Sequence, residues 1–302
     1  MIRPVRFASN AQTAASNRFQ GKSGLDPDAQ NQHAQQEFDA LAAKLRAAGV
    51  KVVALSDTEE PHTPDSIFPN NWVSFHGDGR AVLFPMEAEN RRLERRGDIL
   101  EQLSQEHGYA INEVIDISRY EESGRFLEGT GSLVLDRPNR IAYACLSTRT
   151  HLDPLGEFSQ RMGYEVVAFD AVDPNGVPVY HTNVLMHIGE KLAAICSEAI
   201  RDESQRAAVL RSLADTGHDI VDLTYRQLAA FAGNMLELRS ANGQRLTALS
   251  QRAYDAFDDE QRSKLHNNGK VVPAAIPVIE ASAGGSVRCM LAELHLPMTN
   301  AS

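Results

Sequence analysis

Apolar residues recur along the chain at two alternating spacings, one typical of helices and one typical of strands. In residues 29–50, Phe38, Leu41 and Leu45 recur at helical spacing, which predicts a helix that ends at Gly49. The same criterion predicts helices over residues 87–107, 204–214 and 251–264. Short apolar runs predict strands over residues 50–55, 81–84, 133–135, 141–144, 191–195 and 271–279.

This alternation of strands and helices predicts an α/β fold. Residues 136–140 separate two of the predicted strands and are typical of a hairpin turn. Neither a Gly/Ser linker nor a low-complexity block interrupts the pattern. We therefore expect a single domain over residues 1–302.

A weak internal period accompanies the pattern. Five polar residues lie in or beside apolar, strand-like runs, and they are separated by 63, 53, 53 and 55 residues. A repeat of this size indicates a propeller-like ring of similar units, each of which contributes one residue toward a common axis. The five residues are Asp65, Glu128, His181, Asn234 and Cys289.

Net charge narrows the classes of partner. The 302 residues include 30 Lys and Arg against 40 Asp and Glu, which gives a formal charge of -10. Phosphate backbones and anionic membranes are bound by basic patches, so we expect neither nucleic acid nor a membrane as a partner. A cationic or zwitterionic small molecule is compatible with the charge. One arginine cluster lies among glutamates on a predicted helix and is interpreted as a solvated helix face; it comprises Arg91, Arg92, Arg95 and Arg96.

Cysteine and histidine usage adds two expectations. Cysteines at positions 145, 196 and 289 cannot form a closed disulfide framework, and none belongs to a CxxC pair, which indicates a reduced, cytoplasmic setting. The histidines show neither HExxH nor other paired metal-ligand spacing, so no metal is expected.

The first ten residues lack the apolar stretch of a signal peptide, and no apolar run approaches the roughly 20 residues that span a bilayer.

Cys289 is the candidate nucleophile. It follows Gly284 and Gly285 and leads into an apolar run. Two glycines permit a turn without Cβ clashes, and such a turn can hold the sulfur at the mouth of a cleft. Nucleophilic chemistry would require a stabilised thiolate. A buried, unreactive thiol is an equally good interpretation of this segment by itself.

His181 and Glu128 are the candidates for proton transfer. Alternation over residues 180–186 predicts a strand with His181 and Asn183 on one face. Histidine exchanges protons near neutral pH, although a lone strand histidine is more often structural and His187 is a competing candidate. Glu128 lies beside a glycine and can accept a hydrogen bond from the histidine and orient it. By itself, a solvated turn glutamate is the better interpretation.

Asn70, Asn71 and Arg149 are the candidates for substrate binding. The two asparagines precede the only tryptophan at the start of a predicted strand. Their amides both donate and accept hydrogen bonds and can bind a neutral polar group, although two asparagines after a proline are also typical of a turn. Arg149 follows a predicted strand, where it can hold a carboxylate in a bidentate pair or simply lie on the surface.

In content and order, these segments resemble the pentein superfamily of guanidine-modifying enzymes, which includes dimethylarginine dimethylaminohydrolases, arginine deiminases and amidinotransferases. The resemblance spans residues 2–296 and is greatest to the bacterial citrulline hydrolase and arginine-hydrolase-like branch. It implies a five-bladed α/β-propeller, a single pentein catalytic domain over 1–302, with the active site on a pseudo-fivefold axis. The segments that carry it are 3–20, 64–72, 128–129, 147–149, His181 and 284–289.

The resemblance also implies roles for individual residues. Cys289 corresponds to the family nucleophile, His181 to the general acid/base, and Glu128 to the acidic partner of the histidine. Asp65 corresponds to a substrate-contacting aspartate. Arg149 corresponds to the arginine that binds the α-carboxylate of the substrate.

Two departures from the family pattern bear on the substrate. Dimethylargininases and arginine deiminases carry a carboxylate where this chain has Asn71, and arginine deiminases carry an aspartate where it has Gly131. Both changes lower the negative charge available to a guanidinium. An amide can instead donate to a ureido oxygen and accept from its nitrogens, which favours neutral citrulline over arginine. Asn234 matches a polar position of the fourth repeat to which no role is assigned.

We therefore expect a cysteine-dependent hydrolase that converts L-citrulline to L-ornithine, carbon dioxide and ammonia through a covalent Cys289 intermediate. His181 protonates the leaving nitrogen and then activates water, Glu128 orients His181, and Arg149 and Asp65 position the amino-acid end. No metal or organic cofactor is required, the expected partner is a small amino-acid substrate, and a homo-oligomer is compatible with the sequence. The alternatives are arginine or methylarginine hydrolysis, amidino transfer, and a non-catalytic pentein binding module.

Overall fold

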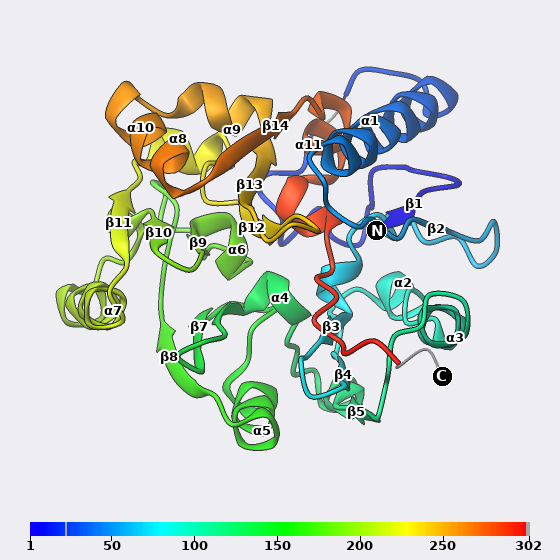
Figure 1. Cartoon of the computed structure of the whole chain (residues 1–302), viewed down its shortest axis with the longest axis horizontal. Helices are drawn as coiled ribbons and strands as arrows, with labels where there is room; N and C mark the ends of the chain where they lie inside the picture. The colour runs from blue at the N-terminus through cyan, green and yellow to red at the C-terminus, as the bar shows by residue number, and fades with distance from the viewer. Residues whose placement is uncertain (22, 300–302) are drawn as a thin grey trace.

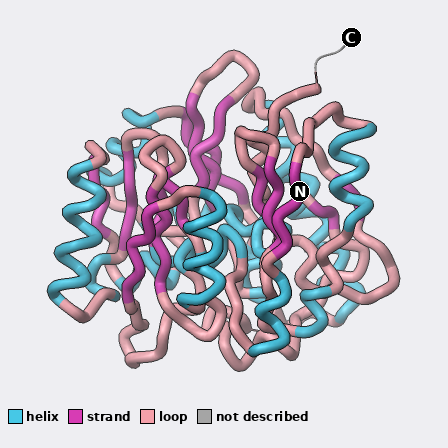
Figure 2. The backbone as a smooth tube through the Cα atoms, turned by 90° about the horizontal axis from the view of Figure 1, so that it is seen from below, coloured by secondary structure: helices cyan, strands magenta, loops and turns pink. Residues whose placement is uncertain are grey.

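The computed structural model describes residues 1–21 and 23–299. Their strands form five small sheets arranged in a ring, with the longer helices on the outside (Figure 1). Figure 2 shows the strands running roughly along the axis of this ring. The strands are β1 Ile2–Arg3, β2 Leu55–Ser56, β3 Val73–Phe75, β4 Arg80–Leu83, β5 Glu113–Asp116, β6 Val134–Asp136, β7 Ile141–Cys145, β8 Glu165–Phe169, β9 Met186–Ile188, β10 Leu192–Ile195, β11 Asp219–Asp222, β12 Leu236–Arg239, β13 Arg245–Ser250 and β14 Lys270–Ala274.

Helices connect the strands and cover the ring. In the described part of the chain no helix is both long enough and apolar enough to cross a membrane. The α-helices are α1 Pro27–Ala47, α2 Glu89–Arg92, α3 Gly97–Gln105, α4 Gly129–Ser132, α5 Leu152–Met162, α6 Thr182–Leu185, α7 Glu203–Asp215, α8 Tyr225–Ala229, α9 Gln251–Ala256, α10 Asp259–Asn268 and α11 Pro277–Ala283. The 3-10 helices are η1 Pro69–Asn71, η2 Ser118–Ser123, η3 Ser197–Ala199 and η4 Val287–Met290.

Four of the sheets repeat one topology, with strand orders β3-β4-β5, β6-β7-β8, β9-β10-β11 and β12-β13-β14. The first two strands form an antiparallel hairpin, and the third returns parallel to the second after a helical crossover. In the fifth sheet, β1 and β2 form the corresponding parallel pair around α1. Five such units around one axis make the expected five-bladed α/β-propeller.

Local sequence explains where the longest helix lies. Asp26 accepts a hydrogen bond from the backbone N–H of Ala29, and proline occupies the first helical position of α1. The predicted apolar face, Phe38, Leu41 and Leu45, is buried against a core cluster that includes residues of β13 and β14. The helix begins two residues before the predicted start and ends at Ala47.

Four predicted elements differ from the structure in their bounds or continuity. The helix predicted over 87–107 is two helices, α2 and α3, and the helix predicted over 251–264 is interrupted where Asp258 caps α10. The strand predicted over 271–279 ends at Ala274, because Pro277 begins α11. Of the strand predicted over 50–55, only Leu55 pairs with a neighbouring strand, in β2. Two of these errors join elements that the Asp258 cap or Pro277 separates.

A helical turn precedes the first strand of each three-stranded unit. η1 precedes β3, α4 precedes β6, α6 precedes β9, and residues 231–234 make a turn before β12. The segment 180–186, predicted to be a strand, is therefore mostly α6, and His181 comes directly before this helix. Thr182 stabilises the turn, because its hydroxyl donates to Ser132 O and accepts from the backbone N–H of Cys145. These turns gather the site residues at one end of the axis.

Candidate active site

The five periodic polar residues are all buried, each with an exposed fraction of 3% or less. Three of them, Asp65, His181 and Cys289, line one cavity of about 10 Å³, which is close to the size of a single water molecule. The sequence-predicted residues Asn71 and Arg149 line the same cavity. Glu128 lies directly behind His181, and Asn234 directly behind Cys289.

Cys289 lies in η4, after the turn that ends α11. Gly284 has a φ of 64°, and a Cβ atom on Gly285 would come within 2.7 Å of the Phe68 ring. Both glycines are therefore needed for the chain to bend and pass Phe68. The sulfur accepts hydrogen bonds from the side-chain amides of Asn183 and Asn234 at 3.4 and 3.3 Å.

The two other cysteines, Cys145 and Cys196, lie in the hydrophobic core. Burial raises the pKa of each thiol to about 12. Neither lines the cavity that Cys289 and His181 share. Cys289 is therefore the cysteine that the fold brings to the same cavity as a buried histidine.

His181 and Glu128 form a buried pair, with 2.8 Å between His181 Nε2 and Glu128 Oε2. Burial by itself would raise the pKa of Glu128, but Arg149 and the hydrogen bond from His181 hold this pKa well below its ordinary value. Burial lowers the pKa of His181 in spite of Glu128. At neutral pH the pair is thus a carboxylate and a neutral imidazole. Nε2–H donates to Glu128, and Nδ1 is free to exchange a proton.

His181 Nδ1 faces Gly131, which has no side chain. A Cβ atom on Gly131 would lie 2.8 Å from His181 Nδ1 and 2.5 Å from Asn71 Nδ2. Gly131, in α4, therefore keeps the histidine and the asparagine within reach of one another. Glu128, for which a solvated turn was the alternative interpretation, is fully buried and directly precedes this short helix.

The adjacent asparagines Asn70 and Asn71 point to different places. Asn71 Oδ1 accepts a hydrogen bond from Arg91 at 2.9 Å, which fixes the orientation of the amide, and Nδ2 is buried with no partner among the described residues. Asn70 donates to the hydroxyl of Thr130 in the neighbouring unit, at 3.3 Å. The residues found lining the cavity include Asn71 and not Asn70.

Arg149 is buried, not on the surface, with an exposed fraction of 2%. It lies 3.4 Å from Glu128 and 3.1 Å from Glu87, and it donates to the hydroxyl of Ser16 at 2.7 Å. Its guanidinium also lies over the Tyr180 ring, 5.0 Å from the centroid. Arg149 thus neutralises Glu128, the carboxylate that accepts from His181. It also contacts the N-terminal segment that covers the cavity, residues 10–17.

Arg91 is the site residue that the sequence interpretation missed, and its placement on a solvated helix face was wrong. It is 2% exposed and makes two hydrogen bonds to Glu94, at 2.9 and 3.0 Å. Its guanidinium also lies 3.7 Å from Asp65 and 3.8 Å from Glu128. Burial opposes its charge, but Glu94 and Asp65 raise the pKa of Arg91 above its ordinary value.

The physical reason for this error is the break between α2 and α3. One continuous helix would carry the arginines around an outer face, whereas the four-residue α2 directs Arg91 toward the axis. The remaining arginines of the cluster are only partly exposed, and Arg95 pairs with Glu121. The sequence contains one weak signal that Arg91 pairs with Glu94: the two residues are three positions apart and so lie on one face of a helical turn.

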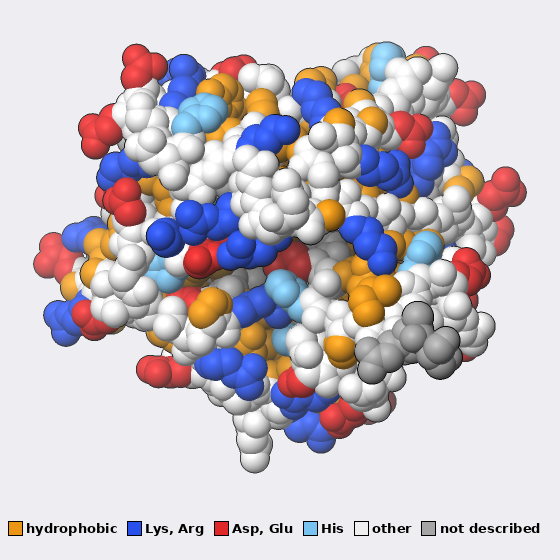
Figure 3. All heavy atoms as spheres, viewed as in Figure 1, with side chains coloured by type: hydrophobic (Ala, Val, Ile, Leu, Met, Phe, Trp, Pro, Cys, Tyr) orange, Lys and Arg blue, Asp and Glu red, His pale blue; other side chains and the backbone are white. Residues whose placement is uncertain are grey.

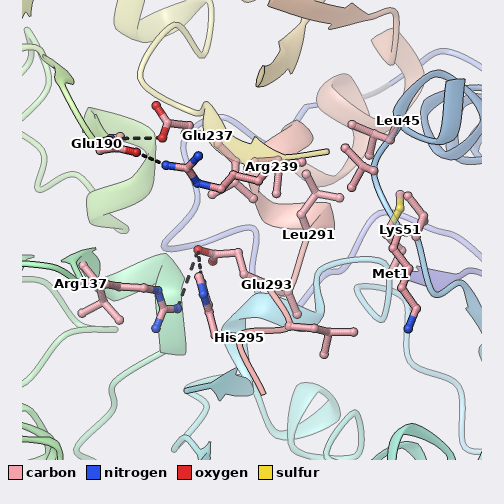
Figure 4. Close-up of a pocket in the computed structure, with 18 of the residues that line it drawn as sticks. Met1, Leu45, Lys51, Arg137, Glu190, Glu237, Arg239, Leu291, Glu293 and His295 are labelled. Carbon is pink, nitrogen blue, oxygen red and sulfur yellow. Dashed lines mark hydrogen bonds and ion pairs between the residues drawn. The ribbon is translucent and has the colours of Figure 1, made fainter. Parts of the chain in front are cut away.

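A larger cavity, of about 760 Å³, opens at the other end of the first strands. Figure 3 shows this face hollowed near its centre, with acidic, basic and histidine side chains around the hollow. In the close-up of Figure 4, Arg239 points to Glu190, and Arg137 and His295 point to Glu293. The last two contacts are 3.7 and 3.5 Å long. Glu190 and Glu293 are thus engaged by neighbouring cations, whereas the buried cysteine, histidine and aspartate lie at the smaller cavity.

A ring of five α/β units with a buried cysteine, histidine and carboxylate at one end of the axis defines the pentein class of enzymes. The family model described as "N,N dimethylarginine dimethylhydrolase, eukaryotic" matches residues 3–296, so the chain belongs to this family of dimethylarginine hydrolases. It is a hydrolase of the class that acts on carbon–nitrogen bonds of arginine-derived side chains. No curated protein matches the sequence at a significant level.

Solved structures with the same fold include three relevant enzymes. The N-terminal domain of ArgZ, an arginine dihydrolase from the ornithine-ammonia cycle in cyanobacteria, is 17% identical with a TM-score of 0.71, and 96% of this chain covers 95% of that domain. AgrE, crystallised with L-arginine, is 17% identical with a TM-score of 0.73, and this chain spans 39% of its length. A dimethylarginine dimethylaminohydrolase bound to S-methyl-L-thiocitrulline is 16% identical with a TM-score of 0.63 and is covered over 96% of each chain.

Proposed function

We propose that this protein hydrolyses L-citrulline to L-ornithine, carbon dioxide and ammonia, with Cys289 as the nucleophile. The observation that carries the choice of substrate is the amide of Asn71. Arg91 holds its oxygen, so the free group is the N–H of Nδ2, which has no acceptor among the residues described. A ureido oxygen accepts such a hydrogen bond, whereas a guanidinium has only donors to offer.

The charges around the cavity also favour a neutral head group. Arg149 neutralises Glu128, and Arg91 pairs with Glu94 and approaches Asp65. A guanidinium would therefore meet two resident guanidinium groups, and Glu128 and Glu94 are already paired with them. A neutral ureido group avoids this repulsion between like charges at low dielectric.

The reaction proceeds in two steps. His181 Nδ1 takes the thiol proton of Cys289, and the thiolate attacks the ureido carbon. Nδ1 then delivers this proton to the terminal nitrogen, and ammonia leaves as the carbon–nitrogen bond breaks. His181 Nδ1 then takes a proton from water, which attacks the S-carbamoyl carbon and releases the thiolate. The resulting N-carboxy group loses carbon dioxide and leaves ornithine. Glu128 keeps His181 in the required tautomer throughout.

Arg149 and Asp65 position the amino-acid end, and Arg91 adds a second cation beside them. A cavity of about 10 Å³ cannot hold an amino acid, so the covering segment moves when substrate enters. This segment contacts both residues, because Asn10 donates to Asp65 and Ser16 accepts from Arg149. The substrate's α-ammonium and α-carboxylate replace these two contacts.

A second candidate is hydrolysis of L-arginine to ornithine, since the structurally similar ArgZ is described as an arginine dihydrolase. One observation favours it. Within residues 1–21 and 23–299, Asp65 Oδ1 and Asn183 Oδ1 are buried acceptors without a hydrogen-bond partner, and a guanidinium has donors for both.

The test is product analysis on separate incubations with citrulline, arginine and methylated arginines, following ornithine, citrulline and ammonia. Citrulline is expected to give ornithine and ammonia in equal amounts, and Cys289→Ala is expected to abolish both. Turnover of citrulline that survives Cys289→Ala would overturn the mechanism. Turnover of arginine with no turnover of citrulline would select the second candidate.

A further inference from the structure

Asn234 is the periodic residue that the mechanism leaves without a task. We propose that Asn234, together with Asn183, is a catalytic hydrogen-bond donor that stabilises the Cys289 thiolate before attack and when it departs from the covalent intermediate. This inference rests on the proposed role of Cys289 as the nucleophile. It does not depend on whether the substrate is citrulline or arginine.

The orientation of the Asn234 amide follows from its hydrogen bonds. Its Oδ1 accepts from the backbone N–H of Arg288 at 3.0 Å, so the nitrogen faces the other way. Nδ2 then donates to the backbone O of Asn183 at 2.9 Å and to Cys289 Sγ at 3.3 Å. The side chain is completely buried, so no solvent competes for these bonds.

A second amide converges on the same sulfur. Asn183 Nδ2 lies 3.4 Å from Cys289 Sγ, and Asn183 is 1% exposed. The two donors come from two neighbouring units of the ring, and the cysteine comes from η4 in a third. A thiolate accepts N–H bonds more strongly than a thiol does, so two fixed donors favour the charged form.

The close approach of these units depends on backbone features that are costly to change. A Cβ atom on Gly233 would lie 2.5 Å from Val184 O, so glycine is required where the turn before β12 contacts α6. On the other side, the Arg288 side chain donates to Leu291 O at 2.8 Å and pairs with Glu293 at 2.7 Å, which anchors η4. The amide-to-sulfur distances are therefore set by rigid packing.

Other charged groups face the same cavity and act on the sulfur as well. The cations Arg91 and Arg149 favour a thiolate, and Asp65 opposes it. Glu128, behind His181, opposes it too, while neutral His181 and Tyr180 line the wall. The amides differ from all of these groups because they contact the sulfur directly and do not titrate. Their effect is accordingly the same at every pH.

The experiment measures thiolate formation directly, without substrate. The ultraviolet thiolate absorbance of wild type, corrected with Cys289→Ser, is recorded against pH and compared with Asn234→Ala, Asn183→Ala and Asn234→Asp. Asn234→Asp retains an oxygen for the Arg288 N–H, so it tests the donor without removing the anchor. The matched control is Asn268→Ala, a buried asparagine that donates to Glu237 by the larger cavity. Thermal unfolding confirms that each variant is folded.

We expect the ratio of thiolate to thiol at a given pH to fall about tenfold in Asn234→Ala and Asn183→Ala, and further in Asn234→Asp. The Asn268→Ala variant should titrate like wild type. With an active substrate, kcat should fall while KM changes little, because the amides contact the reacting sulfur. An unchanged thiolate titration in folded Asn234→Ala and Asn183→Ala would overturn the inference. A wild-type enzyme that is inactive on every ureido and guanidino compound would instead overturn the proposed function.

Discussion

Arg91 donates from Nη1 to Oδ1 of Asn71 across 2.9 Å, and both side chains are about 2% exposed. This contact holds the amide oxygen of Asn71 and leaves Nδ2 as the amide group with no partner among the described residues. Arg91→Met removes the contact and leaves the Glu94 carboxylate buried without its cation. We expect kcat/KM to fall on the order of 100-fold and the free energy of unfolding to fall by roughly 3 kcal/mol.

Arg91→Lys separates the two effects in this prediction. Lysine retains a positive charge for Glu94 but cannot hold both Glu94 and Asn71 in the fixed geometry of a guanidinium. Stability measured by urea titration should recover in part, while kcat/KM should stay low. Full activity in Arg91→Lys would show that orienting Asn71 is not the task of this arginine.

Asn71→Asp should shift the enzyme from citrulline toward arginine. A carboxylate pairs with a guanidinium, and it loses the N–H that a ureido oxygen requires. The ratio of kcat/KM for arginine to that for citrulline should rise at least about tenfold. Asn175→Asp makes the same chemical change at an exposed position and serves as the control. If the ratio is unchanged in Asn71→Asp, this amide does not determine the head-group preference.

Gly131→Ala should damage the reaction more than the fold. The added Cβ would lie 2.5 Å from Asn71 Nδ2 and 2.8 Å from His181 Nδ1, so both side chains must shift. Steady-state kinetics should show a loss of kcat/KM on the order of 100-fold. In α5, Gly156 has open space around it, and Gly156→Ala should raise helix stability by about 1 kcal/mol with unchanged kinetics. Equal kinetics for the two variants would contradict the placement of His181.

Acid should destabilise the protein through two buried histidines away from the reaction. Burial lowers the pKa of His76 to about 3 and that of His187 to about 4. The unfolded chain binds these protons near pH 6.5 and the folded chain does not, so stability falls as pH drops from 6.5 toward 4. For His187 this loss reaches roughly 3 kcal/mol at pH 4.

His187→Asn tests this pH dependence, because an amide N–H can replace the Nδ1–H donor to Met235 O without binding a proton. Urea midpoints measured between pH 7 and pH 4.5 should fall less steeply in this variant than in wild type. His33→Asn, at an exposed position, is the matched control and should retain the wild-type slope. A wild-type slope in His187→Asn would assign the acid sensitivity to other groups.

Several parts of the site follow from sequence order alone. The period that relates Asp65, Glu128, His181, Asn234 and Cys289 predicts units around one axis, because each turn before a first strand occupies the same place in its unit. Glycine at 284 and 285 predicts the bend before Cys289, because glycine permits a turn without Cβ clashes. These signals are local, or depend only on regular spacing.

Tertiary structure decided what spacing does not encode. The sequence places Arg91 among several arginines on a helix of mixed charge. Only the break after α2 and the packing against Asp65 place it at the cavity that Cys289 lines. Asn70 and Asn71 are adjacent and chemically identical, yet one contacts Thr130 and the other Arg91. The sequence determined which residue types recur around the axis. The three-dimensional packing decided which buried donors and acceptors pair with one another and which are left for a substrate, because burial makes each unpaired polar group costly.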